Sequence, residues 1–177
     1  ETPLGAILVN DDSFNLTGSS PFIDNADDGY GHGTGVAALA ALGRRPYNVD
    51  YKGMISADAR LLSIKIMDGT NGYLSMLDVL HLLKKAKMKY PTIKSFVLTT
   101  CYSWSKRTNE APSPYAFELD KFAHDEDCLI FICTANNPGI DNQSSYDLNY
   151  FKEEETNLCT PAESMNNIVI GAAADNL

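Results

Sequence analysis

The sequence predicts an α/β fold with a mostly parallel sheet and helices on both faces, in three layers. Short apolar runs typical of buried strands alternate with segments whose apolar residues recur at helical spacing. Each connection between successive strands is long enough for a parallel crossover. No internal repeat or linker interrupts this order, so the 177 residues are predicted to form one domain or a large piece of one.

Composition and charge limit the classes of function. The chain is 44% hydrophobic and 21% charged, which is typical of a globular protein with a substantial core. Its net charge of -9 argues against nucleic acids and anionic membranes as partners, because both bind basic surfaces. There is no apolar run of about 18 residues, so we expect no membrane span. No signal peptide precedes Glu1, which we interpret as the start of a mature or excised segment.

The first half of the chain contains three expected elements separated by polar loops. Residues 10–28 are rich in Asn, Asp, Ser and Gly and are expected to form turns. Gly43 follows an Ala/Leu run and is a typical helix stop. The three elements are a short strand over Leu4–Val9, a buried helix over 31–43 and a strand over 60–66.

The second half supplies the remaining helices and strands. Ser75 and Asp78 form a capping box, and Ser113 with Pro114 is a typical helix start. The predicted elements are a helix over 75–88 ended by Pro91, a strand within 93–101, a helix from 114 to about 124, a strand over 128–133 buried on both faces, and a strand within 167–173.

His32 lies between two glycines at or just before the N-terminus of the first predicted helix. The positive end of the helix dipole disfavours an imidazolium there, so a neutral ring with a free lone pair is expected. Such a ring suits a general base. Taken alone, the motif is more typical of an ordinary histidine beside a turn.

Several acidic residues gather in the polar loop before His32. Their carboxylates are hard oxygen ligands of the kind calcium prefers, so a structural calcium ion is possible there. The spacing does not match an EF-hand, and solvated turn residues are the simpler interpretation. We therefore assign no metal ligands. The acids in question are Asp11, Asp12, Asp24, Asp27 and Asp28.

The cysteines and glycosylation patterns bear on the compartment. The spacings of Cys101, Cys128, Cys133 and Cys159 fit no zinc template, and the sequence does not define a disulfide pairing. Two triplets, beginning at Asn15 and Asn142, match the N-glycosylation pattern. They favour a secreted, extracellular protein.

Three separated segments resemble the subtilisin-like serine peptidases (subtilases). Gly31-His32-Gly33-Thr34, followed by Val36-Ala37, resembles the family's His-Gly-Thr-His-Val-Ala motif. The run from Thr134 to Gly139 follows an apolar strand and resembles the oxyanion segment Ala-Ala-Gly-Asn-x-Gly. The run from Pro161 to Asp175 resembles the next strand of the family. The order of these segments matches over about residues 4 to 176.

The resemblance implies a role for each matched residue. His32 would be the general base that takes the proton of the nucleophile. Asn137 would donate a hydrogen bond to the developing oxyanion. A polypeptide substrate would pair as an added strand along the cleft, and no cofactor would be required. The residues implied to line that cleft are Thr100, Cys101, Tyr102, Ala135 and Asn136.

Some positions depart from the family pattern. Gly35 stands where the family usually has His, and Asn136 where it prefers Gly. Cys101-Tyr102 replaces what is a small, Gly-containing pocket edge in the family, and the Tyr102 ring would narrow or block the groove. These departures motivate an alternative, a non-catalytic binding domain of subtilase descent. An unrelated nucleotide-binding domain is disfavoured, because no Gly-x-Gly-x-x-Gly or P-loop follows any predicted strand.

The other two triad members have no clear match in the sequence. No serine lies in a Gly-Thr-Ser-Met-Ala motif. Asp12, followed by Ser13 and Phe14, is the only candidate for the triad acid, and the better alignment places that aspartate before Glu1. We therefore expect the central part of a subtilase catalytic domain, inactive alone or completed by the rest of its domain as another chain.

Overall fold

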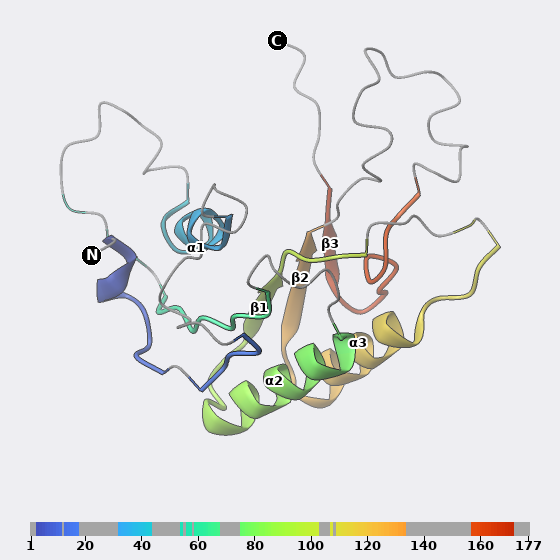
Figure 1. Cartoon of the computed structure of the whole chain (residues 1–177), viewed down its shortest axis with the longest axis horizontal. Helices are drawn as coiled ribbons and strands as arrows, with labels where there is room; N and C mark the ends of the chain where they lie inside the picture. The colour runs from blue at the N-terminus through green and yellow to red at the C-terminus, as the bar shows by residue number, and fades with distance from the viewer. Residues whose placement is uncertain are drawn as a thin grey trace, which may run out of the picture. The chain divides into compact units, whose positions relative to one another are not determined.

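The chain divides into two compact units, Glu1–Leu82 and Leu83–Leu177, which are treated separately. The structure is a computed structural model that describes residues 3–11, 13–17, 32–43, 54, 56–57, 59–67, 75–102, 107, 109–133 and 157–171. None of the helices in these ranges is long and apolar enough to cross a membrane. The elements labelled in Figure 1 are α1 (His32–Leu42), α2 (Met76–Lys89), β1 (Ser95–Leu98), α3 (Pro114–Asp125), β2 (Leu129–Cys133) and β3 (Ile168–Ile170).

The second unit contains a three-stranded parallel sheet in the order β1-β2-β3. In the register of β1 and β2, Phe96 lies beside Ile130 and Leu98 beside Ile132. β3 adds to the other side of β2 with Val169 beside Ile132. Helix α2 precedes β1 in the sequence, and α3 connects β1 to β2. This order confirms the predicted α/β class with parallel pairing (Figure 1).

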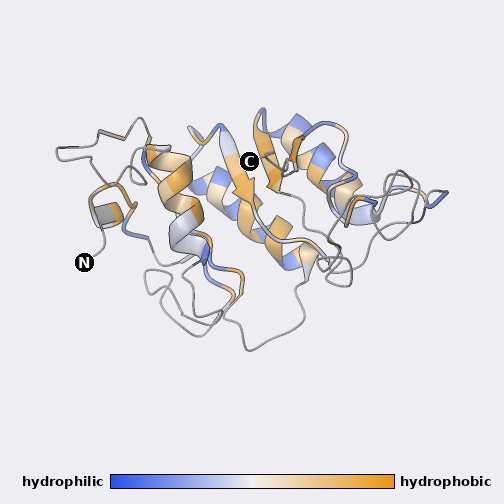
Figure 2. Cartoon of the chain, turned by 90° about the horizontal axis from the view of Figure 1, so that it is seen from above, coloured by the Kyte–Doolittle hydropathy of each residue, from blue (hydrophilic) through white to orange (hydrophobic). Residues whose placement is uncertain are grey.

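Helix α3 packs against one face of this sheet. The ring centroids of Phe96 on β1 and Phe122 on α3 are 5.7 Å apart, in a tilted arrangement that aromatic pairs favour. Ile130 and Ile132 are fully buried. The strands are largely hydrophobic, whereas α3 carries residues of both kinds, as an amphipathic helix does (Figure 2). The buried side chains of α3 are Ala116, Leu119, Phe122 and Ala123.

The opposite face of the sheet is more open than the sequence predicted. The run over 128–133 was expected to be buried on both faces, and this expectation is wrong, because Leu129 is 43% exposed. Val97, Ile168 and Ile170 are also exposed. Successive side chains of a strand point to opposite faces of the sheet. Helix α3 covers the face on which Ile130 and Ile132 lie, whereas Leu129 points to the opposite face.

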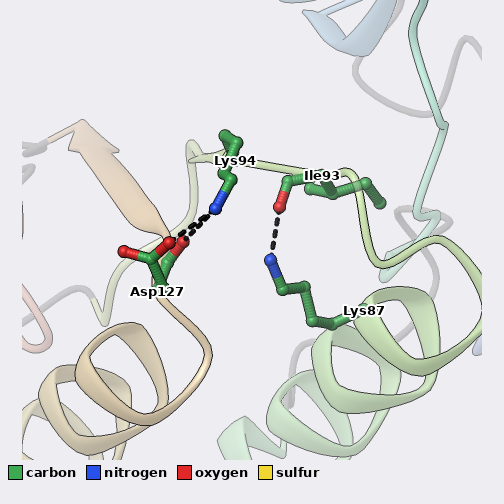
Figure 3. A network of polar contacts seen from close by, with 4 residues as sticks. All are labelled: Lys87, Ile93, Lys94 and Asp127. Carbon is green, nitrogen blue, oxygen red and sulfur yellow. Dashed lines mark hydrogen bonds and ion pairs between the residues drawn. The ribbon is translucent and has the colours of Figure 1, made fainter.

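Polar contacts fix the starts of β1 and β2 (Figure 3). Lys87, at the end of α2, is buried and donates from Nζ to the carbonyl of Ile93 at 2.6 Å. Lys94 pairs with the Asp127 carboxylate at 2.5 Å and also donates to the Asp127 carbonyl. Asp127 has a left-handed backbone (φ 48°), which lets the chain turn from α3 into β2. The ammonium group of Lys94 lowers the pKa of Asp127.

Two helix predictions in this part of the chain are confirmed with their local signals. The Asp78 amide donates to Ser75 Oγ at 3.4 Å, and α2 ends before Pro91. At α3 the Ser113 hydroxyl accepts from the Ala116 amide at 3.1 Å, and Pro114 occupies the first turn. Both helices therefore begin with the N-cap that their sequences specify.

The first unit corrects two strand predictions. Leu4–Val9 was expected to be a strand, but Pro3–Ala6 forms a 3-10 helix in which the Leu4 carbonyl accepts from Ile7 and Leu8. The segment 60–66 makes isolated parallel bridges at Leu61 and Lys65 and no continuous strand. A turn separates the two bridges, because the Asp11 side chain accepts from the amide and the hydroxyl of Ser13.

Helix α1 forms where the sequence predicted it. Gly43 follows it with φ +63° and donates to the carbonyl of Leu39, which is the expected helix stop. The expectation that this helix is buried is not met, because none of its residues is buried and Leu39 is 49% exposed. Ala and Leu occupy every side of α1, so no single apolar face defines what covers it.

Candidate functional site

His32 is the first residue of α1 and is exposed. This confirms the predicted position of the imidazole at a helix N-terminus, where an exposed ring is accessible to a reactant. The helix follows directly from the Gly-His-Gly pattern, because the Ala/Leu run after it has high helix propensity. The position is compatible with proton transfer to and from a bound group.

Thr100, Cys101 and Tyr102 lie just after β1, at the carboxyl edge of the sheet. All three are half-buried. The backbone amide of Tyr102 donates to the Thr160 carbonyl at 2.8 Å. Its ring packs against Tyr115 in the first turn of α3, with centroids 5.8 Å apart. Both the backbone and the ring of Tyr102 are therefore held by neighbouring segments.

The carboxylate of Glu163 accepts hydrogen bonds from two segments at the same edge. Glu163 Oε1 accepts from the Thr160 hydroxyl at 3.1 Å and from the Ser113 amide at 3.0 Å. Burial alone would raise the pKa of Glu163, but hydrogen bonds from Ser113 and Thr160 outweigh it and lower that pKa. The carboxylate thereby links the start of α3 to the segment that holds Tyr102.

Thr100 brings hydrogen-bonding capacity to this edge. Its Oγ1 is buried, and no hydrogen bond to it is found within the described part of the chain. Cys101, next along the chain, is a half-buried free thiol.

The four cysteines are all described, and Cys101, Cys128 and Cys133 are free thiols. Cys128 is buried between α3 and β2, and burial raises the pKa of its thiol. Cys159 is fully buried. These thiols fit the role of small core residues more closely than that of nucleophiles or ligands.

The remaining candidates fall outside the described residues. They are Asn137 as oxyanion donor, Ala135 and Asn136 in the cleft, and Asp12 as triad acid. The structure thus brings Thr100, Cys101 and Tyr102 together at one edge and places His32 in the other unit.

The acidic loop is described only at Asp11. This residue is buried, and its Oδ1 accepts from the Ser13 amide at 3.1 Å and from the Ser13 hydroxyl at 2.7 Å. Asp24, Asp27 and Asp28 lie outside the described residues. Within the described ranges, no three His, Cys, Asp or Glu side chains are grouped as a metal ion would need. Asp11 therefore serves as a turn residue here.

Three residues at the carboxyl edge were not singled out from the sequence. Thr160 and Glu163 have the Thr-x-x-Glu spacing of a capping box, which is a local signal that could have been used. The third residue, Tyr115, lies in the first turn of α3. Its contact with Tyr102 depends on the tertiary fold and has no sequence signal.

Comparison with known proteins adds one finding. Neither a curated protein nor a solved structure matches the chain. The model of the Subtilase family (Peptidase S8) matches residues 9–176, a range that includes the Gly-His-Gly motif at the start of α1 and all three strands. Because this match spans nearly the whole sequence, the chain belongs to the subtilase family of serine peptidases.

Proposed function

We propose that the chain is the central part of a subtilisin-like serine endopeptidase catalytic domain, with His32 as general base and Asn137 in the oxyanion hole. The nucleophilic serine, and the aspartate that orients His32, would be supplied from outside these 177 residues. The observation that carries the proposal is the family match over residues 9–176. The exposed position of His32 at the first residue of α1 supports it.

In the proposed reaction, His32 accepts the proton of the serine hydroxyl as the oxygen attacks the scissile carbonyl. The carbonyl oxygen becomes an oxyanion, and the Asn137 side-chain amide donates a hydrogen bond to it. His32 then gives its proton to the leaving amine as the peptide bond breaks, and water resolves the acyl-enzyme by the same steps. A single oxyanion donor contributes about 2.7–4 kcal/mol to transition-state stabilisation.

The cleft would lie at the carboxyl edge of the sheet, where ligands of parallel sheets bind. Thr100, Cys101 and Tyr102 follow β1 at that edge. Ala135 and Asn136 come directly after β2 in the sequence and would line the other side. An extended substrate would add as a strand between the two segments. The partner is then a polypeptide, without nucleic acid or membrane, and the reaction needs no cofactor.

We also propose that the protein is secreted. The glycosylation triplets at Asn15 and Asn142 support this location. The free thiols of Cys101, Cys128 and Cys133 weaken that support, since secreted domains often pair their cysteines. Glycosidase treatment of the protein recovered from culture medium would test it, and a protein found only in cell extracts would contradict it.

Peptide hydrolysis by the full-length protein tests the proposed activity. His32→Ala should lower kcat by several orders of magnitude, because triad members act as a unit. His81→Ala is the matched control, since His81 is also exposed and lies on α2. Asn137→Ala should lower kcat about 10²–10³-fold with little change in KM.

The alternative, a non-catalytic subtilase-like domain, predicts a different result. Gly35, Asn136 and Tyr102 depart from the family pattern and motivate it. In that case the full-length protein would hydrolyse no peptide, and His32→Ala would leave peptide binding unchanged. Hydrolysis that survives His32→Ala would contradict both accounts of this residue.

A further inference from the structure

We infer that Tyr115 is a positioning residue that holds the Tyr102 ring as a wall of the substrate cleft, restricting one substrate side chain to a small size. The inference rests on the proposed peptidase function and names a determinant of its specificity. Tyr115 lies in the first turn of α3, outside the segments assigned to the cleft.

The contacts of Tyr102 come from two other segments of the chain. Its amide donates to the Thr160 carbonyl at 2.8 Å, which fixes the backbone after β1. Its ring centroid lies 5.8 Å from that of Tyr115, with the planes inclined by 43°. Because backbone and ring are both restrained, the ring has little freedom to move aside for a bulky ligand.

The start of the helix that carries Tyr115 is itself anchored. Ser113 caps α3 through its hydroxyl, and its amide donates to Glu163 at 3.0 Å. Glu163 also accepts from Thr160, whose carbonyl holds Tyr102. Hydrogen bonds thus connect the backbone of Tyr102, through Thr160, Glu163 and Ser113, to the first turn of α3, which carries Tyr115.

Size selection follows from this arrangement. Tyr102 and Tyr115 are both half-buried, so part of the surface of each residue is accessible. A tyrosine ring that is prevented from rotating fills volume that a glycine would leave open. Excluding or admitting one methylene group changes specificity by about 10–200-fold. Peptides with Ala or Ser at the affected position should therefore be cleaved in preference to peptides with Leu or Phe.

The test compares two fluorogenic peptides that differ only in Ala or Phe before the scissile bond, with the full-length protein. Wild type should favour Ala, and Tyr102→Gly should shift the kcat/KM ratio toward Phe by at least about tenfold. Tyr115→Ala should shift it in the same direction through KM for the Phe peptide, and Tyr115→Phe should restore the wild-type ratio. Phe117→Ala is the control, because Phe117 is 64% exposed on the same helix.

The outcomes separate the inference from the proposed function. One outcome is that the wild type cleaves both peptides with a kcat/KM ratio that neither Tyr102→Gly nor Tyr115→Ala changes. This result would overturn the role of the two tyrosines in specificity and leave the proposed peptidase function standing. If the wild type cleaves no peptide and is not labelled by a serine-directed fluorophosphonate, the proposed peptidase function is overturned, and so is the specificity role that rests on it. Thermal unfolding of each variant verifies that a changed ratio comes from folded protein.

Discussion

The side chain of Asn167 donates from Nδ2 to the Asp120 carboxylate at 3.0 Å, joining the middle of α3 to the start of β3. The same carboxylate accepts from the Ser164 hydroxyl and from the amides of Met165 and Asn166. Asn167 Oδ1 in turn accepts from the Ile130 amide on β2 at 3.1 Å. Asp120 on α3 therefore holds the turn that immediately precedes β3.

Replacing Asp120 by Ala should destabilise the protein by about 2–3 kcal/mol, because several hydrogen bonds to a charged acceptor are lost together. Urea unfolding of the full-length protein measures this. Lys121→Ala, at an exposed neighbouring position on α3, serves as the control and should change little. Equal midpoints for Asp120→Ala and wild type would contradict the assigned role.

The packing of α3 on β1 depends on Phe122, which is 2% exposed and contacts Phe96. Phe122→Ala should cost about 3–5 kcal/mol, since it removes a buried ring and leaves a cavity. Phe117→Ala on the exposed side of the same helix should cost less than about 0.5 kcal/mol. Calorimetric unfolding compares the two variants, and similar losses would argue that α3 does not pack as described.

Glu163 should make stability depend on pH in the acid range. Its pKa is lowered from the ordinary value of 4.5 in the folded protein. The folded carboxyl therefore contributes stability that is present above pH 4.5 and is lost as pH falls through the folded pKa. Wild type should be more stable than Glu163→Gln at pH 7, and the difference should shrink on acidification toward pH 3. A difference that stays constant over this range would contradict the assignment.

The two lysines at the start of the sheet should differ in their contributions. Lys87 is 7% exposed, and its ammonium bonds the Ile93 carbonyl. Lys87→Met keeps an apolar stem but leaves that carbonyl without its donor, at a cost of about 1–3 kcal/mol. Lys94→Met removes an exposed ion pair with Asp127 and should have a smaller effect. Denaturant titration decides between them, and the reverse order would be inconsistent with the burial of Lys87.

The sequence predicts α2, α3 and the three strands because their signals are local. Ser113-Pro114 specifies a helix start by itself, and the apolar run ending at Cys133 specifies a strand. Leu4–Val9 was misassigned because its apolar pattern also suits a 3-10 turn closed by the Leu4 carbonyl. The 60–66 segment was misassigned because pairing depends on a partner strand, which turns at residues 11–17 interrupt.

The positions of the site residues could be predicted only where a local sequence motif or a short segment determines them. His32 sits at the start of α1 as the Gly-His-Gly pattern indicated. The contacts that hold Tyr102 could not be predicted, because they join residues far apart in the chain, such as Ser113 and Glu163 at a separation of 50 residues. Such contacts appear only when the sheet brings the carboxyl ends of its strands to one edge.

The central claim is that His32 is the base that activates a serine nucleophile. Fluorophosphonate labelling of the full-length protein, followed by mass spectrometry of its peptides, tests it most directly. We predict that one serine outside the 177 residues is labelled, that His32→Ala abolishes labelling, and that His81→Ala leaves it unchanged. Labelling of His32→Ala at the wild-type rate, or no labelling of the wild type, would contradict the claim.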